Sequence, residues 1–193
     1  MKTSNNYVLK GIAFIVSLTI TLILGACGTK ESTAQNGKSN VEPPEIDIHT
    51  AVLTENLDAL KQHIEAGTNI NEKDPFGGSS PLISAAVFGK TEMAKVLIDA
   101  GADLNFQNND GSTALITSAF FCRPEIVKML LDKGADKTIK NKFGTNAYEN
   151  VAGPFADVKD AYDMMGKMLE PMGLKLDYEY IQKTRPEIAE MLK

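Results

Sequence analysis

The hydrophobic and polar positions of this chain fall into three regions. Residues 12–24 (IAFIVSLTITLIL) form one continuous apolar run, and residues 28–45 (GTKESTAQNGKSNVEPPE) contain almost nothing that could be buried. From residue 46 onward, apolar and polar positions alternate in a pattern that repeats along the chain. The pattern predicts an export signal, a flexible spacer and then one folded domain.

The apolar run follows Lys2 and Lys10, and its 13 residues are fewer than the roughly 20 that cross a bilayer as a helix. It ends at residues 24–27 (LGAC), which resemble the lipobox of bacterial lipoproteins. The resemblance implies that residues 1–26 are removed and that Cys27 carries at least two acyl chains, enough for stable anchoring. The protein would then lie on the extracytoplasmic side of a cell membrane or outer membrane. An ordinary secretory signal and an uncleaved anchor are the alternatives.

The folded region contains an internal repeat with a period of 33 residues. Residues 78–103 align with residues 111–136, and both copies fit G-S-[ST]-[PA]-L-I-x-x-A followed by E-x-x-K-x-L-x-D-x-G-A-D. The period and the pattern resemble the ankyrin repeat, a turn followed by two helices. The resemblance implies an all-α repeat protein, an ankyrin-repeat solenoid of about four repeats with hairpin fingers, over residues 46–193.

Individual residues suit that fold. Ser80 and Thr113 stand where a hydroxyl can cap a first helix. Pro124, which has no N–H to leave unsatisfied, suits the first turn of a second helix. Gly101 and Gly134 stand where the second helices end and a left-handed residue is needed.

The two histidines belong to a first repeat with a looser sequence, which begins near Asp47. His49 falls on the histidine of the family's T-P-L-H motif, so the resemblance implies a hydrogen bond to backbone between repeats, not a ligand role. His63 is expected in the core. The pair shows no metal-ligand spacing, and no cofactor is expected.

The last repeat is expected to contain an insertion. It begins at Phe143, and its second helix is predicted to start at residues 185–188 (RPEI), which copy residues 123–126. Residues 153–184, approximately, would then form the insertion. Residues 158–169 carry apolar positions at helical spacing, which predicts an amphipathic helix inside it.

Charge and cysteine content narrow the function. The formal net charge is −5, and removing Lys2 and Lys10 from the 20 basic residues leaves 18 against 25 acidic residues, or −7. Such a balance disfavours nucleic-acid binding, which needs clustered cations. The two cysteines are Cys27 and Cys122, so lipidation of the first leaves no disulfide. Cys122 replaces the glycine found at Gly89, and its loop is therefore expected to be stiffer or differently shaped.

The ankyrin resemblance implies binding of another protein by a concave surface, with no catalytic role. No catalytic constellation stands out in the sequence, and an enzyme is not expected. Aromatic residues among the contact positions would suit a binding hot spot, although Phe88 and Phe121 could instead pack beneath a neighbouring repeat or the insertion. The positions carried over from the family are Phe76, Ser79, Val87, Phe88, Asn109, Asp110, Ser112, Phe120, Phe121, Lys142 and Phe143.

A methionine cluster supports a competing function. Met164, Met165, Met168 and Met172 could place thioethers on one side of a helix, and such groups can hold Cu(I). The simpler interpretation is an apolar helix face, because methionine fills irregular gaps. The partner's identity stays open among an exported enzyme, a toxin and a component of an envelope assembly.

Overall fold

The computed structural model describes residues 40–193, which belong to one compact unit. Cys27, the predicted signal in residues 1–26 and most of the spacer in residues 27–45 lie outside the described residues. Among the helices of residues 40–193, none has both the length and the apolar composition needed to cross a membrane.

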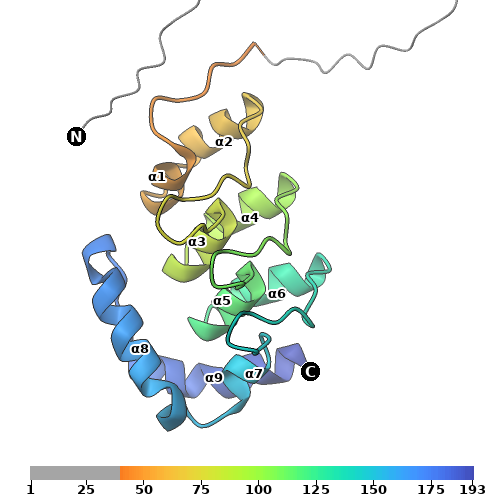
Figure 1. Cartoon of the computed structure of the whole chain (residues 1–193). Coiled ribbons are helices and arrows are strands. Elements are labelled where there is room, and N and C mark those ends of the chain that lie inside the picture. The colour runs from red at the N-terminus through yellow and green to blue at the C-terminus, as the bar shows by residue number, and fades with distance from the viewer. Residues whose placement is uncertain (1–39) are drawn as a thin grey trace, which may run out of the picture. The chain divides into compact units, whose positions relative to one another are not determined.

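The helices form stacked pairs (Figure 1). The first three pairs are α1 (Ile48–Leu53) with α2 (Leu57–Glu65), α3 (Pro81–Phe88) with α4 (Thr91–Asp99), and α5 (Ala114–Phe120) with α6 (Pro124–Asp132). The first helices α1, α3 and α5 pack in one row, and α2, α4 and α6 in a second. The predicted all-α repeat solenoid is confirmed.

The fourth pair consists of α7 (Glu149–Ala152), which packs on α5, and α9 (Tyr178–Leu192), which packs on both α6 and α7. Between them lie α8 (Phe155–Leu169) and the 3₁₀ turn η1 (Glu170–Met172). The last repeat therefore carries a partly helical insertion, as the sequence predicts.

The start of α9 differs from the prediction. Pro186 lies inside the helix, whereas Pro124 opens α6. The cause is Asp177, whose carboxylate accepts a 3.0 Å hydrogen bond from Tyr180 N and caps a helix that begins at Tyr178. Pro186 therefore falls within α9, and the helix lacks one backbone N–H donor at that residue.

The predicted caps are present. Ser80 Oγ accepts from Ile83 N, and Thr113 Oγ1 accepts from Ile116 N. Gly101 and Gly134 follow their helices with φ of 85° and 83°, in the left-handed region. Fully buried alanines on the first helices, namely Ala51, Ala85, Ala86 and Ala119, let these helices approach closely. Local sequence thus sets the length of each helix and the spacing of the stack.

Both histidines are structural. His49 Nε2 lies 3.1 Å from the carbonyl oxygen of Glu72, which joins α1 to the next hairpin. His63 is 4% exposed, and its ring nitrogens contact Thr68 Oγ1 at 3.1 Å and the carbonyl oxygen of Ile46 at 2.8 Å. These contacts confirm the backbone role of His49 and the core position of His63.

Candidate functional site

The tips of the hairpin fingers carry the most exposed large hydrophobic side chains of the described residues. Phe76 is 87% exposed and Phe143 is 76% exposed. Offsets of 34 and 33 residues relate Phe76, Asp110 and Phe143, so one repeat position supplies each tip. Asp110 is also exposed. Burying the rings of Phe76 and Phe143 against another molecule would lower the free energy by removing apolar surface from water. The tip position of the repeat is therefore a candidate contact site.

Each tip is held by an Asp or Asn side chain two residues earlier. Asp74 accepts hydrogen bonds from the backbone amides of Phe76 and Gly77, both at 2.8 Å, and of Ser79 at 2.6 Å. Asn108 and Asn141 accept the equivalent bonds, to Asp110 N and to Phe143 N, both at 3.0 Å. These turns fix the direction in which each tip residue points.

The contact positions carried over from the ankyrin family do not include Asp74, Asn108 or Asn141. The sequence does contain a signal for their role, because they recur at the same offsets of 34 and 33 residues as the tip residues. Short polar side chains of this kind accept hydrogen bonds from nearby backbone amides in turns.

Asp74 has a pKa below its usual 3.8. Partial burial of the carboxylate acts to raise the pKa, but the hydrogen bonds from the amides of Gly77, Phe76 and Ser79 favour the charged form and together outweigh burial. The finger turn is therefore most stable when this carboxylate is ionised.

Backbone hydrogen bonds also join successive tips. Asn109 N donates to the carbonyl oxygen of Gly77 at 2.9 Å, and Lys142 N donates to that of Asp110 at 2.8 Å. Gly78 has φ of 64°, and a Cβ there would lie 2.4 Å from Asn109 Oδ1. A side chain at position 78 would be strained at this φ and would displace the Asn109 amide. The two backbone hydrogen bonds join the three fingers into one connected row.

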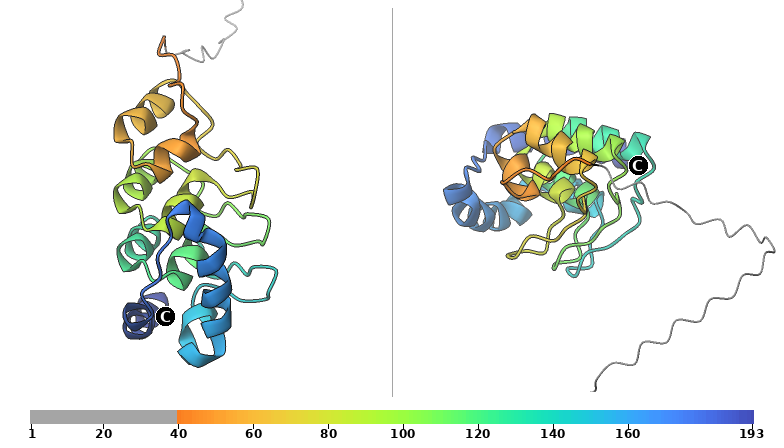
Figure 2. Two further views of the ribbon diagram at one scale, coloured as in Figure 1. Left: turned by 90° about the vertical axis from the view of Figure 1, so that its left-hand side faces the viewer. Right: turned by 90° about the horizontal axis from the view of Figure 1, so that it is seen from above.

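The inserted helix α8 lies beside the first helices, on a different side from the fingers (Figure 2). Tyr162 attaches it to the stack: the side chain is fully buried, its ring stacks on Phe120 at 4.4 Å between centroids, and its hydroxyl donates to the Phe120 carbonyl oxygen. Arg185 of α9 donates to the same hydroxyl at 3.1 Å and to the carbonyl oxygen of Gly153 at 3.1 Å. The fingers and α8 thus border different sides of the first helices.

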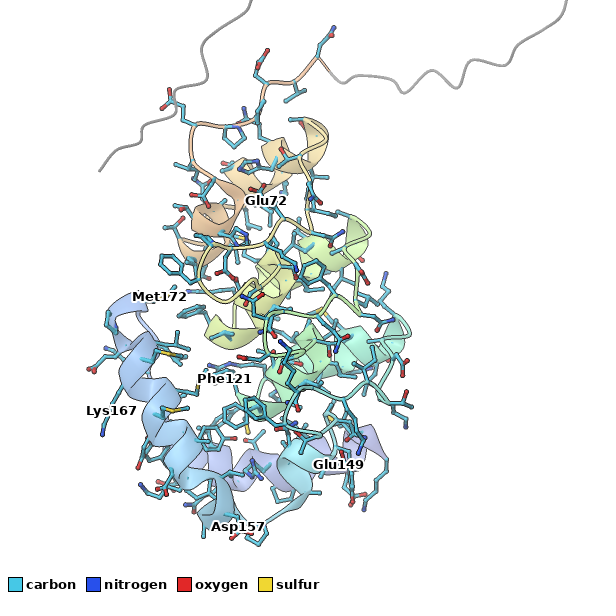
Figure 3. The ribbon with its side chains drawn as sticks, in the orientation of Figure 1. Glu72, Phe121, Glu149, Asp157, Lys167 and Met172 are labelled. Carbon is cyan, nitrogen blue, oxygen red and sulfur yellow. The ribbon has the colours of Figure 1, made fainter. Side chains whose placement is uncertain are left out.

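The insertion corrects one predicted contact residue. Phe121 is 3% exposed and packs edge-on against Phe120, with 5.1 Å between ring centroids (Figure 3). It cannot offer area to a partner, because the C-terminal end of α5 is covered where Tyr162 of α8 stacks on Phe120. The remaining predicted positions keep some exposure: Ser79, Val87, Phe88, Ser112 and Phe120 are partly buried, and Asn109, Asp110 and Lys142 are exposed.

Cys122 does not give its loop the different shape that the sequence allowed for. Its φ is 53°, close to the 65° of Gly89, and Glu55 at the same repeat position has φ of 56°. The loop therefore keeps the left-handed shape despite the side chain, which is fully buried with Sγ 3.7 Å from the carbonyl oxygen of Ile181. Burial of the thiol raises its pKa to about 11.

The methionines of the insertion divide between two environments. Met164, Met168 and Met172 are 63%, 58% and 49% exposed and recur every four residues, whereas Met165 is partly buried. Met172 lies on the side toward the repeats and Lys167 on the opposite side (Figure 3). Within residues 40–193, no group of three or more His, Cys, Asp or Glu residues is placed to hold a metal ion. Met164 and Met168 lie on α8, whereas Met172 belongs to the 3₁₀ turn η1, so the three exposed methionines do not share one helix.

Residues 48–141 match the family model described as ankyrin repeats in three copies. This part of the chain consists of ankyrin repeats. The structure of the ankyrin repeat domain of Bcl-3 superposes with a TM-score of 0.52 and 31% sequence identity, over 53% of this chain and 45% of that one. The solved structure therefore agrees with the family model.

Two curated relatives are similar to part of this chain. Protein phosphatase 1 regulatory subunit 27 of Homo sapiens is 38% identical over 64 residues, which are 33% of this chain and 41% of that protein. The DNA-binding protein RFXANK of Homo sapiens is 38% identical over 58 residues, 30% of this chain and 22% of that protein. The chain matches less than half the length of each of these relatives.

Proposed function

We propose that this protein binds another protein through the finger tips and the first helices, while an acylated Cys27 anchors it to the extracytoplasmic side of a membrane. Ankyrin repeats generally mediate protein–protein binding. The observation that carries the proposal is the pair Phe76 and Phe143, two exposed rings at one repeat position on tips held by Asp74 and Asn141. Ordered aromatic side chains of this kind are typical of binding hot spots.

The names of the relatives support binding in general and no particular partner. Protein phosphatase 1 regulatory subunit 27 carries a regulatory role in its name, which fits a protein that acts by binding another protein. The match to the DNA-binding protein RFXANK covers 22% of that protein, and the acidic balance here argues against nucleic acid. We therefore propose a protein ligand.

The anchoring half of the proposal rests on the sequence of residues 12–27. Its physical logic is that acyl chains on Cys27, followed by a polar spacer, would retain the repeats at the membrane and leave their surface accessible. Cys27→Ser should move the protein from the membrane fraction to the soluble fraction, or leave residues 1–26 attached. Unchanged membrane retention together with normal processing would refute lipidation.

Site-specific photo-crosslinking tests the binding half. A photoreactive residue at position 76 or 143 should crosslink to one recurring protein, because both tips would contact the same partner. The same residue at Lys128, exposed on α6 in the second row of helices, is the matched control and should not give that product. Identical products from the three positions would contradict the proposal.

A further inference from the structure

The last repeat contains an open cavity at the end of the stack farthest from α1 (Figure 1). Its volume is about 330 Å³, and residues of α7, of the start of α8 and of α9 line it. Ligand sites in proteins occupy roughly 300–1,000 Å³, so this cavity has room for a small molecule. The cavity lies outside residues 48–141, the part that matches the ankyrin family model, and no finger tip lines it.

The lining of the cavity includes a buried positive charge. Arg185 is 2% exposed, and its guanidinium donates to two neutral oxygens, the hydroxyl of Tyr162 and the carbonyl oxygen of Gly153. Arg185 forms no ion pair with a carboxylate of residues 40–193. A buried charge without a counter-charge costs free energy, so an anion in the cavity would stabilise this guanidinium.

The amino end of α8 adds positive potential at the same cavity. Pro154 and Phe155, where α8 begins, are lining residues, and Pro154 supplies no side-chain acceptor for the first amides of the helix. Such amides carry a partial positive charge, which favours an anion. The lining residue Glu190 is a carboxylate, but it pairs with Lys193 and so does not balance the charge of Arg185.

The other walls of the cavity are largely apolar. They include Val151, Phe155, Pro186 and Ala189. Such walls favour a ligand with an apolar group, because burial removes the apolar surface of that group from water. One guanidinium balances one negative charge, which suits a carboxylate better than a phosphate group with a charge of about −1.5 to −2.

We propose that this cavity binds a small apolar carboxylate, with the carboxylate group beside Arg185 and the amino end of α8 and the apolar group against Phe155 and Pro186. The site goes beyond the proposed protein-binding function, which concerns the finger tips and the first helices. Because α8 and α9 both contribute to the lining, a bound ligand would join the insertion more firmly to the last repeat.

Titration with an acid that has a single aromatic ring tests the proposal. Phenylacetate should bind the purified full-length protein saturably, with a Kd of about 1 mM or tighter, and should raise the midpoint of thermal unfolding. Phenylacetamide has nearly the same shape and no charge, so it should bind at least about tenfold more weakly. Ligand-observed NMR measures both affinities.

Two variants assign the binding to the cavity. Arg185→Gln removes the charge and should weaken phenylacetate binding at least about tenfold. Arg123→Gln is its matched control, because Arg123 occupies the same place in the copied residues 123–126 and does not line the cavity.

The second variant keeps Arg185 and fills the cavity instead. Ala189 is 8% exposed and lines the cavity, so Ala189→Leu should also weaken phenylacetate binding about tenfold by taking up space. Ala156→Leu is the matched control, since Ala156 is exposed on α8 and does not line the cavity. Far-ultraviolet circular dichroism checks that each variant is folded.

A free acid and the C-terminus of a polypeptide both present an apolar carboxylate. A tripeptide that ends in Phe, compared with phenylacetate, distinguishes these sources: tighter binding of the tripeptide assigns the site to a polypeptide C-terminus, and tighter binding of phenylacetate assigns it to a free acid.

Three results would overturn the inference: no saturable binding of either acid, equal binding of phenylacetate and phenylacetamide, or unchanged binding by folded Arg185→Gln and Ala189→Leu variants. None of them affects crosslinking from positions 76 and 143, which tests the proposed function separately. Loss of that crosslinking would overturn the proposed function and leave the cavity site standing.

Discussion

The guanidinium of Arg185 donates a 3.1 Å hydrogen bond to the hydroxyl of Tyr162, although the two residues belong to different helices of the last repeat. The same hydroxyl donates to the carbonyl oxygen of Phe120 at the end of α5. Arg185 is 2% exposed and Tyr162 fully buried, so water cannot replace either bond. This chain of three residues fixes the insertion against the repeats.

Tyr162→Phe tests that attachment. The change leaves the buried Phe120 carbonyl oxygen and one Arg185 donor without partners, and we expect a loss of about 2 kcal/mol of unfolding free energy in urea. Tyr180→Phe is the control, since Tyr180 is 42% exposed and should tolerate the change. Equal stability of the two variants would show that the Arg185–Tyr162–Phe120 chain does not stabilise the fold.

The left-handed position shared by Glu55, Gly89 and Cys122 gives a second prediction. Glu55 has φ of 56°, a conformation that is unfavourable for a residue with a Cβ. Glu55→Gly should be more stable than Glu55→Gln by about 1 kcal/mol, because both lose the ion pair with Lys90 and only glycine relieves the backbone. Thermal unfolding of the two variants measures the difference, and a more stable Gln variant would contradict it.

Asp74 makes the stability of the first finger depend on pH. Its folded pKa lies below the usual 3.8, so its stabilising contribution is present above that unfolded value and disappears as pH falls through the folded pKa. Asp74→Asn should be less stable at pH 7 by about 1 kcal/mol and should lose less stability on acidification below pH 4. Parallel acid dependence of the two proteins would remove Asp74 as the cause.

Cys122 should be unreactive in the folded protein. A pKa of about 11 leaves only about one thiolate in a thousand at pH 8, and the side chain is fully buried. In a Cys27→Ser background, Cys122 is the one remaining thiol. Alkylation by iodoacetamide at pH 8 should be slow in buffer and fast in urea. Fast labelling in buffer would mean that α9 opens readily.

The structure could be predicted best in the repeats, because each repeat can be compared with another copy in the same chain. The 33-residue period predicted the helix pairs. The helix ends were also predictable, because they depend on local signals: the capping hydroxyls of Ser80 and Thr113 and the left-handed glycines Gly101 and Gly134. The left-handed shape at Cys122 was also predictable from Gly89. The side chain of Cys122 does not change the backbone there, because the repeat geometry sets the left-handed φ at this position.

The insertion could be predicted only as a helix. Its apolar spacing indicated α8, but no second copy in the chain indicated where α8 would pack. The burial of Phe121 and the stacking of Phe120 on Tyr162 depend on that long-range packing. The early start of α9 had a local signal in Asp177, but the copied residues 185–188 favoured a later start.

The outward side of α9 has a consequence for assembly. Its exposed residues include Lys183, Glu187 and Glu190, spaced along one side, while Ile181, Ile188 and Leu192 face the stack and are buried. A solenoid with an apolar terminal face would recruit another unit and grow into a filament. The charged outward side of α9 opposes such growth.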